Sequence, residues 1–145
     1  MEPTIYLFFN QNCLEAMTHY AKVLGGEIGD VFRNADAPDA ESRMPGGDHL
    51  VMNMAMKLGT ATVMASDAPG NMYSKPQGFA VTISPPSRAE FDRIFEGLAK
   101  DALSVMMPPG ETFWAERFAM FTDCFGTPWM LSYAGSKAAN QEISR

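Results

Sequence analysis

The stretch Leu-Gly-Thr-Ala-Thr-Val-Met-Ala-Ser at residues 58–66 has a counterpart in Phe-Gly-Thr-Pro-Trp-Met-Leu-Ser-Tyr at residues 125–133. In both stretches a Gly-Thr pair separates two apolar runs, which is the sequence pattern of a β-hairpin. Each hairpin is preceded by an apolar strand-like run that leads into an amphipathic helix. The chain is therefore predicted to contain two copies of one small unit, with a cavity where the copies meet.

Each copy is expected to have the order strand, helix and three strands. In the first half the pattern predicts strands at 4–9, 28–32, 50–56 and 60–65, a helix at 14–24 and a long, mobile loop at 34–48. After a linker at 67–77, it predicts strands at 79–83, 103–107, 118–122 and 127–133, and a helix with an apolar stripe of Phe91, Ile94, Phe95 and Leu98. The stretch Asn-Gln-Asn at 10–12 can cap the first helix, and Pro-Pro-Ser at 85–87 is expected to cap the second.

Composition narrows the class of protein. The chain has 145 residues, of which 46% are hydrophobic and 19% charged, as in ordinary globular domains. A net charge of −6 without basic clusters argues against a nucleic-acid partner. No apolar run is long enough for a membrane span, and no signal segment is visible at Met1. Two cysteines, Cys13 and Cys124, are too few for a disulfide scaffold, so we expect a cytoplasmic protein with reduced thiols.

Three further stretches carry a family resemblance: Tyr-Leu-Phe-Phe at 6–9 through Asn-Cys at 12–13, Ala-Ser-Asp at 65–67, and residues 111–130 from Glu-Thr-Phe-Trp-Ala to Gly-Thr-Pro-Trp-Met. With the order βαβββ-βαβββ, residues 3–134 resemble the vicinal oxygen chelate superfamily of glyoxalases, extradiol dioxygenases and bleomycin-resistance proteins, and within it the PhnB-like (3-demethylubiquinone methyltransferase-like) group. The resemblance implies an α+β fold: two βαβββ modules, at about 3–67 and 78–134, form curled mixed sheets around a shared cup. The modules make one domain, 1–135, followed by a frayed tail, 136–145. It also implies a homodimer.

Enzymes of this superfamily hold a divalent metal on His, Glu or Gln from the first and last strands of each module. Carried over to this sequence, those positions fall near Ile5, Val63, Phe79 and Met130, and a slip of one residue would put Tyr6 in the place of Ile5. Hydrocarbon and thioether side chains are poor ligands for hard divalent ions. We therefore expect no metal and no cofactor.

Two polar groups of the first half are candidate ligand contacts. Asn53 stands where PhnB-like relatives carry a His, and it is either an outward-facing polar residue or a hydrogen-bonding group that orients a ligand. Tyr6 lies on a strand with one face toward the expected cup, and its phenol either fills the core or contacts a ligand. A thiol at a helix start, such as Cys13, can have a lowered pKa, but no base or resolving Cys is discernible, so we do not expect Cys13 to be reactive.

The second half adds Trp114, Arg117 and Met130 to the candidate pocket. Trp114 offers a flat surface for stacking and Arg117 a planar fork for an anion. Alternatively, Trp114 covers the core and Arg117 pairs with Glu116 or with Asp123, the latter belonging to a structural turn.

Three functions are open at this stage. The first hypothesis is metal-independent binding of a small apolar or aromatic molecule by a PhnB-like protein. The alternative is a metal-dependent enzyme of the lyase, dioxygenase or isomerase type, so catalysis stays undecided. A third possibility is a duplicated domain that serves as an assembly surface.

Overall fold

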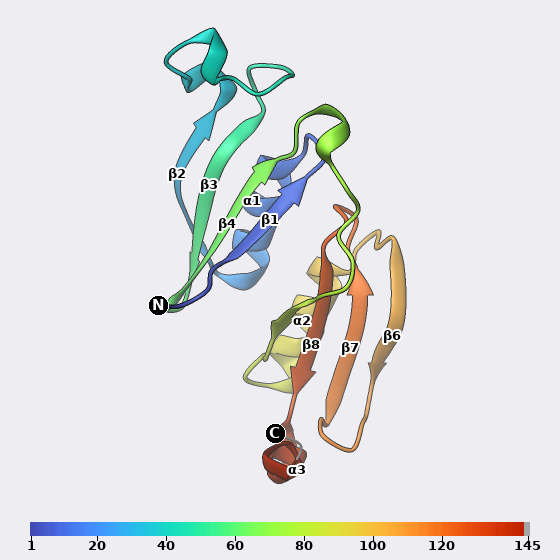
Figure 1. Cartoon of the computed structure of the whole chain (residues 1–145). Helices are drawn as coiled ribbons and strands as arrows, with labels where there is room; N and C mark the ends of the chain where they lie inside the picture. The colour runs from blue at the N-terminus through green and yellow to red at the C-terminus, as the bar shows by residue number, and fades with distance from the viewer. Residues whose placement is uncertain (144–145) are drawn as a thin grey trace. The chain divides into compact units, whose positions relative to one another are not determined.

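The computed structural model describes residues 1–143 and divides into two compact units, Met1–Lys75 and Pro76–Arg145 (Figure 1). Each unit has the order strand, helix and three strands, and each contains one four-stranded mixed sheet. The predicted α+β class and the two βαβββ modules are thus confirmed. The shared cup and the homodimer depend on how units are assembled, and both stay predictions.

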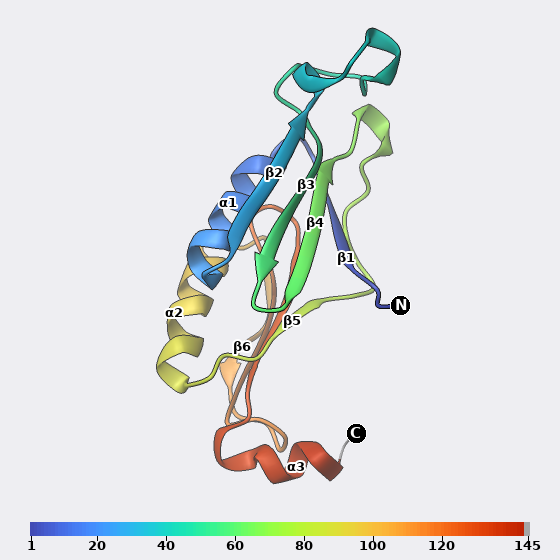
Figure 2. The ribbon, with the colours of Figure 1, turned by 90° about the vertical axis from the view of Figure 1, so that its left-hand side faces the viewer.

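The first unit contains β1 (Ile5–Phe9), α1 (Cys13–Leu24), β2 (Glu27–Arg33), β3 (Val51–Leu58) and β4 (Ala61–Asp67). The order in the sheet is β1-β4-β3-β2, with β1 parallel to β4 and the other pairs antiparallel. One face of the sheet packs on α1, as Figure 2 shows. Successive side chains of a strand point to opposite faces, so the buried residues Leu7, Phe9, Met54 and Met56 identify the face that contacts the helix.

The start of α1 differs from the prediction. Asn12 makes no side-chain cap, and the N–H of Cys13 donates instead to Oδ1 of Asp67 at 3.0 Å. The other oxygen of Asp67, Oδ2, accepts the N–H of Val51 at 2.8 Å. A buried carboxylate from the end of β4 therefore holds the first helical N–H and the first residue of β3.

The segment that was predicted to be a long, mobile loop is organised around one buried side chain. It contains two short 3₁₀ helices, η1 (Asn34–Asp36) and η2 (Ala40–Ser42). Nδ2 of Asn34 donates to the carbonyls of Met44 and Gly47, and Oδ1 of Asn34 accepts the N–H of Met44. These three bonds satisfy the buried amide and fold the loop back on its own start.

The second unit contains β5 (Val81–Ile83), α2 (Arg88–Leu98), β6 (Ser104–Gly110), β7 (Arg117–Thr122) and β8 (Pro128–Tyr133). The order in the sheet is β5-β8-β7-β6, with β5 parallel to β8. Ser87 caps α2 as predicted, because its Oγ accepts the N–H of Glu90 at 3.1 Å. Strand β6 extends three residues beyond the predicted end at Met107, since an edge strand tolerates the two prolines that follow.

Buried side chains of β7 and β8 make the core of this unit with α2. Phe121 contacts Phe95 of α2 edge-on, with ring centroids 5.4 Å apart. Asp123, at the end of β7, accepts the N–H groups of Phe125 and Thr127 and the indole N–H of Trp129. Asp123 therefore has the structural turn role that the sequence suggested.

The chain beyond β8 does not fray as predicted. Residues 135–143 form η4 (Gly135–Lys137) and α3 (Ala138–Ile143), and this segment contacts the loop before β7. The predicted tail also includes residues 144–145, which lie outside the described residues. Among the helices of residues 1–143, none is long and apolar enough to cross a membrane.

Candidate functional site

The helix-free face of the first sheet carries the first two predicted site residues. This face is the one opposite α1, and the strand register assigns it Tyr6, Phe8, Asn53, Ala55, Met64 and Ser66. Tyr6 and Phe8 are 36% and 54% exposed, and their ring centroids are 5.0 Å apart. Two adjacent aromatic rings on a sheet surface offer an apolar platform for a flat molecule.

Tyr6 and Asn53 meet across β4. The Nδ2 group of Asn53 donates to the phenol oxygen of Tyr6 at 3.3 Å. The phenol O–H can still donate to a ligand, and the amide oxygen of Asn53 can accept from one. The structure therefore brings these two predicted residues together in one polar pair beside the aromatic platform.

A hollow of about 380 Å³ adjoins this pair where β2 ends and β3 begins. Its walls include Phe32, Pro38, Met52 and Asn53. The side chain of Phe32 is exposed and lies opposite Asn53 in the register of β2 and β3. Arg33 and Asp36 also line the hollow, so its wall is mostly apolar but carries one amide and one charge of each sign. Its volume is that of a small-molecule site.

Met130 lies on the corresponding face of the second sheet. The helix-free face there is opposite α2, and the register assigns it Thr82, Phe118, Met120, Met130 and Ser132. Met130 pairs with Thr82 of β5 on one side and with Met120 of β7 on the other. Hydroxyl and thioether groups therefore surround Met130.

The register corrects three of the four positions that were aligned with the superfamily's metal ligands. Ile5 pairs with Val63, but Val63 is buried on the α1 side together with Met56. Tyr6 and Met64 are the pair on the helix-free face. Phe79 precedes β5, and Thr82 is the partner of Met130.

The corrected positions do not fit a hard divalent ion either. They hold a phenol, a hydroxyl and two thioethers, at Tyr6, Thr82, Met64 and Met130, whereas such ions prefer carboxylate oxygens or imidazole nitrogens. Within residues 1–143, no group of three or more His, Cys, Asp and Glu side chains lies in a metal-binding arrangement.

Trp114 belongs to the loop before β7 and packs between two phenylalanines. Its ring centroid is 4.9 Å from that of Phe113 and 5.4 Å from that of Phe118, both edge-on. Phe118 belongs to the helix-free face, so Trp114 covers part of the face that carries Met130. Its partial exposure leaves ring surface available to a ligand.

Arg117 is turned to the other face of the same sheet. Its Nε donates to Oδ1 of Asp92 at 2.6 Å, and its guanidinium carbon lies 5.5 Å from the ring centroid of Phe91. Both partners belong to α2, and neither is the Glu116 or Asp123 that the sequence suggested. The structure thus does not bring Arg117 together with Met130, and the guanidinium already has a carboxylate partner.

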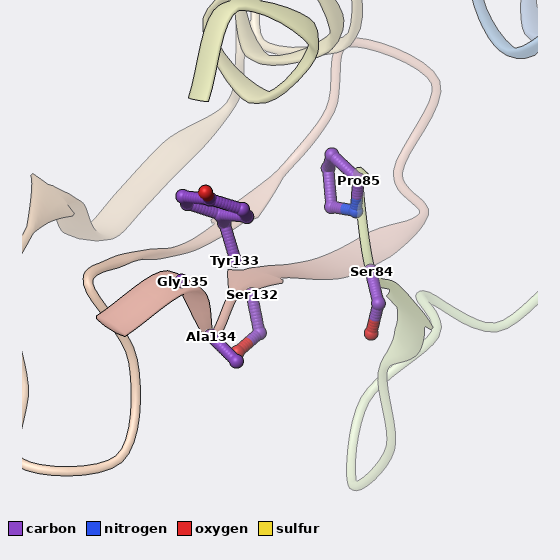
Figure 3. A pocket seen from close by; sticks show the side chains of 6 residues that line it. All are labelled: Ser84, Pro85, Ser132, Tyr133, Ala134 and Gly135. Carbon is purple, nitrogen blue, oxygen red and sulfur yellow. The ribbon is translucent and has the colours of Figure 1, made fainter. Parts of the chain in front are cut away.

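A second, smaller hollow of about 210 Å³ lies at the ends of β5 and β8. Figure 3 shows its lining, in which Ser132 and Tyr133 point to opposite sides of the chain. The Oγ of Ser132 is buried and has no hydrogen-bond partner among residues 1–143. Ser84 and Ser132 were not predicted as site residues. Side chains alternate between the two faces of a strand, and Leu131 is buried, so Ser132 could have been placed on the same face as Met130.

The two thiols have opposite environments. Cys13 is fully buried, and this burial, with a smaller contribution from the Asp67 carboxylate, raises the pKa of its thiol far above the usual range. This agrees with the expectation that Cys13 is not a reactive thiol, because desolvation disfavours the thiolate. Cys124 is exposed in the hairpin between β7 and β8.

Comparisons with known proteins agree with this architecture. The protein YjdN of Escherichia coli K12 is 30% identical over an alignment of 135 residues, and the match covers 88% of this chain and 91% of YjdN. The crystal structure of PA1353 from Pseudomonas aeruginosa is 35% identical, covers 92% of this chain and 97% of its own, and superposes with a TM-score of 0.80. A PhnB protein from Bacillus cereus shares the fold at 24% identity, with a TM-score of 0.77 over 92% of this chain and 100% of its own.

A family model supplies the assignment. The model of the Glyoxalase/Bleomycin resistance protein/Dioxygenase superfamily matches residues 6–131, which include most of both sheets. The chain belongs to this superfamily, as a relative of YjdN.

Proposed function

We propose that this protein binds a small apolar or aromatic molecule without a metal ion. The observation that carries the proposal is the set of side chains on the helix-free faces of β1, β4, β5 and β8. They are aromatic, thioether or hydroxyl groups, and none is a carboxylate or an imidazole. Binding then depends on apolar contact and on a few hydrogen bonds.

The first unit offers the better-formed binding surface. Its aromatic platform of Tyr6 and Phe8 adjoins a polar pair and a hollow of about 380 Å³. The platform is apolar and adjoins one phenol and one amide, and the two charges in the hollow are of opposite sign, so the surface favours a flat molecule without net charge that carries a hydroxyl group. The phenol would donate to the oxygen of that hydroxyl, and the amide oxygen of Asn53 would accept its proton.

The test is a titration with 1-naphthol, a neutral bicyclic aromatic, after removal of divalent ions with EDTA. We expect saturable binding whose affinity does not change when Mn²⁺, Ni²⁺ or Zn²⁺ is restored. Phe8→Ala should weaken binding by about 2- to 12-fold, which is the range that one aromatic contact of 0.5–1.5 kcal/mol gives. Tyr6→Phe, which keeps the ring and removes one hydrogen bond, should weaken it by a similar factor.

Met72→Ala is the matched control, because Met72 is 72% exposed and belongs to η3 (Gly70–Met72), outside the four strands of the first sheet. It should leave the affinity unchanged. Binding that requires an added metal ion would instead support the metal-dependent enzyme. Equal affinities for the wild type, Phe8→Ala and Tyr6→Phe would contradict the proposed surface.

A further inference from the structure

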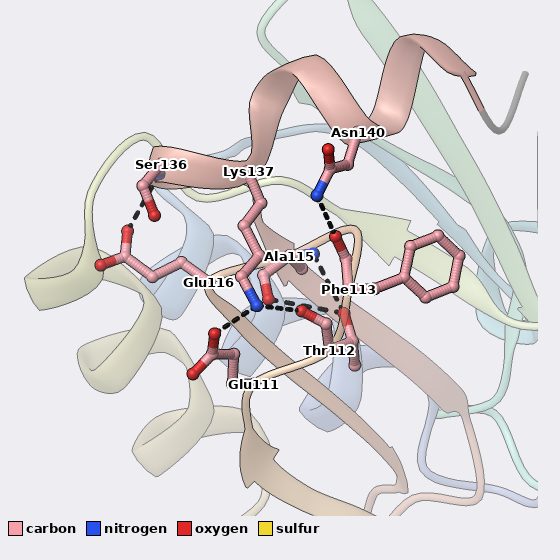
Figure 4. Close-up of polar contacts among 8 residues, drawn as sticks. All are labelled: Glu111, Thr112, Phe113, Ala115, Glu116, Ser136, Lys137 and Asn140. Carbon is pink, nitrogen blue, oxygen red and sulfur yellow. Dashed lines mark hydrogen bonds and ion pairs between the residues drawn. The ribbon is translucent and has the colours of Figure 1, made fainter.

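The chain end after β8 makes a set of polar contacts that neither its sequence nor the proposed function anticipates. We call residues 134–140 the strap and residues 111–116 the aromatic loop. The ammonium of Lys137 donates to the carbonyl of Thr112 at 2.6 Å and forms an ion pair with Glu111. The side-chain amide of Asn140 donates to the carbonyl of Phe113, also at 2.6 Å (Figure 4). Two successive carbonyls of the loop are thus bound by strap side chains.

The strap also holds the far end of the aromatic loop. The N–H of Glu116 donates to the carbonyl of Ala134 at 3.1 Å, and the carboxylate of Glu116 accepts the N–H of Ser136 at 3.3 Å. Within the loop, the N–H of Thr112 donates to the carbonyl of Ala115, and Oγ of Thr112 accepts the N–H of Ala115. The loop is therefore closed on itself and anchored on both sides of Trp114.

The ion pair of Lys137 joins a largely buried cation to an exposed carboxylate. The side chain of Lys137 is 23% exposed and that of Glu111 is 66% exposed, so water screens this pair much as it screens a surface pair. The hydrogen bond and the charge of Lys137 lower the pKa of Glu111 below the ordinary value. The aromatic loop and the strap are therefore joined by a polar cluster in which the Glu111 carboxylate is ionised at neutral pH.

Gly135 shows that the docked conformation is specified by the sequence. Its φ is +54°, a conformation that side-chain-bearing residues rarely adopt. A Cβ at this position would overlap the Glu116 carboxylate and lie 2.8 Å from the ring of Tyr133. Only glycine lets the chain turn here and keep the carboxylate in contact with Ser136.

We propose that Lys137 and Asn140 are positioning residues: the strap holds the aromatic loop so that Trp114 stays packed on Phe118, over the helix-free face that carries Met130. The docking of the strap on the loop can be measured without any ligand. Loss of the strap contacts would leave two loop carbonyls to water and release Trp114 from its edge-on packing.

The experiment uses full-length protein labelled with 5-fluorotryptophan, which gives one ¹⁹F resonance for Trp114 and one for Trp129. Trp114→Phe assigns them. We expect Gly135→Ala and the double variant Lys137→Met, Asn140→Ala to shift the Trp114 resonance toward that of exposed fluorotryptophan. The Trp129 resonance should not move, because this indole is buried and bonded to Asp123. Gly70→Ala is the matched control, since Gly70 has a φ of +52° and open space around it.

The fluorine resonances report on the loop with or without a ligand, so their outcome does not depend on whether 1-naphthol binds. An unchanged Trp114 resonance in both strap variants would overturn the inference. A Trp129 resonance that moves together with that of Trp114 would also overturn it, because the variants would then disturb the core of the unit and not the loop alone.

Discussion

Replacing Asp67 should destabilise the first unit more than any other single carboxylate change in it. The carboxylate is buried and accepts two N–H groups, from Cys13 at 3.0 Å and from Val51 at 2.8 Å. A hydrogen bond to a charged group contributes about 1.5–3 kcal/mol, so Asp67→Ala should cost about 3–6 kcal/mol. Asp67→Asn keeps one acceptor oxygen but turns an NH₂ group toward the second donor, and it should cost about 1.5–3 kcal/mol.

The assay for these variants is urea unfolding followed by far-ultraviolet circular dichroism, together with hydrogen exchange at the two amides. The N–H groups of Cys13 and Val51 should exchange faster in both Asp67 variants. Asp48→Asn is the control, because Asp48 forms only an exposed ion pair with Arg43, and it should change stability by less than about 1 kcal/mol. A loss below about 0.5 kcal/mol in Asp67→Ala, with unchanged exchange, would refute the assigned role of this carboxylate.

Three other predictions concern single groups. In the native protein at pH 8, a thiol reagent should modify exposed Cys124 and leave Cys13 unmodified, because burial raises the pKa of Cys13 and blocks access; equal rates would contradict this. The Glu111 carboxylate should titrate by NMR below its ordinary pKa of 4.5, and Lys137→Met should raise that midpoint; the pair therefore stabilises the fold above about pH 4.5 and is lost as the pH falls through the lowered value. Met54→Ala should lower the free energy of unfolding by about 2–5 kcal/mol in urea, because Met54 is fully buried; a loss under 1 kcal/mol would argue against its place in the core.

The sequence was sufficient to predict the helices and strands and the duplicated unit, because both depend on local patterns. The hairpin signal at Gly59 and Gly126, the glycine end of α1 and the Ser87 cap all involve residues within a few positions of one another. These patterns predicted two βαβββ modules, and the structure confirms them.

The face on which each side chain lies could not be read in the same way. In the first unit a two-residue turn joins β3 to β4, with Leu58 paired to Ala61, whereas in the second five residues lie between the paired Thr122 and Pro128. Counting four residues from each glycine therefore reaches the buried face at Val63 and the helix-free face at Met130. A shift of one residue in register exchanges the two faces of a strand.

Long-range polar partners were also beyond local reasoning. Arg117 pairs with Asp92, which lies 25 positions away, and Lys137 bonds to Thr112 at the same separation. The residues that flank Arg117 and Lys137 in the sequence do not indicate these partners. The ion pair with Asp92 turns Arg117 away from the face that carries Met130. The bond to Thr112 fixes Lys137 against the loop before β7.

The account depends most on the claim that the helix-free faces hold no ion. The direct measurement is elemental analysis of the purified protein, combined with calorimetric titration of the EDTA-treated chain with Mn²⁺, Ni²⁺ and Zn²⁺. We predict no stoichiometric metal and no saturable heat for any of the three ions, because Tyr6, Met64, Thr82 and Met130 supply neither carboxylate nor imidazole. One bound ion per chain, lost in Tyr6→Phe or Thr82→Val, would contradict the account.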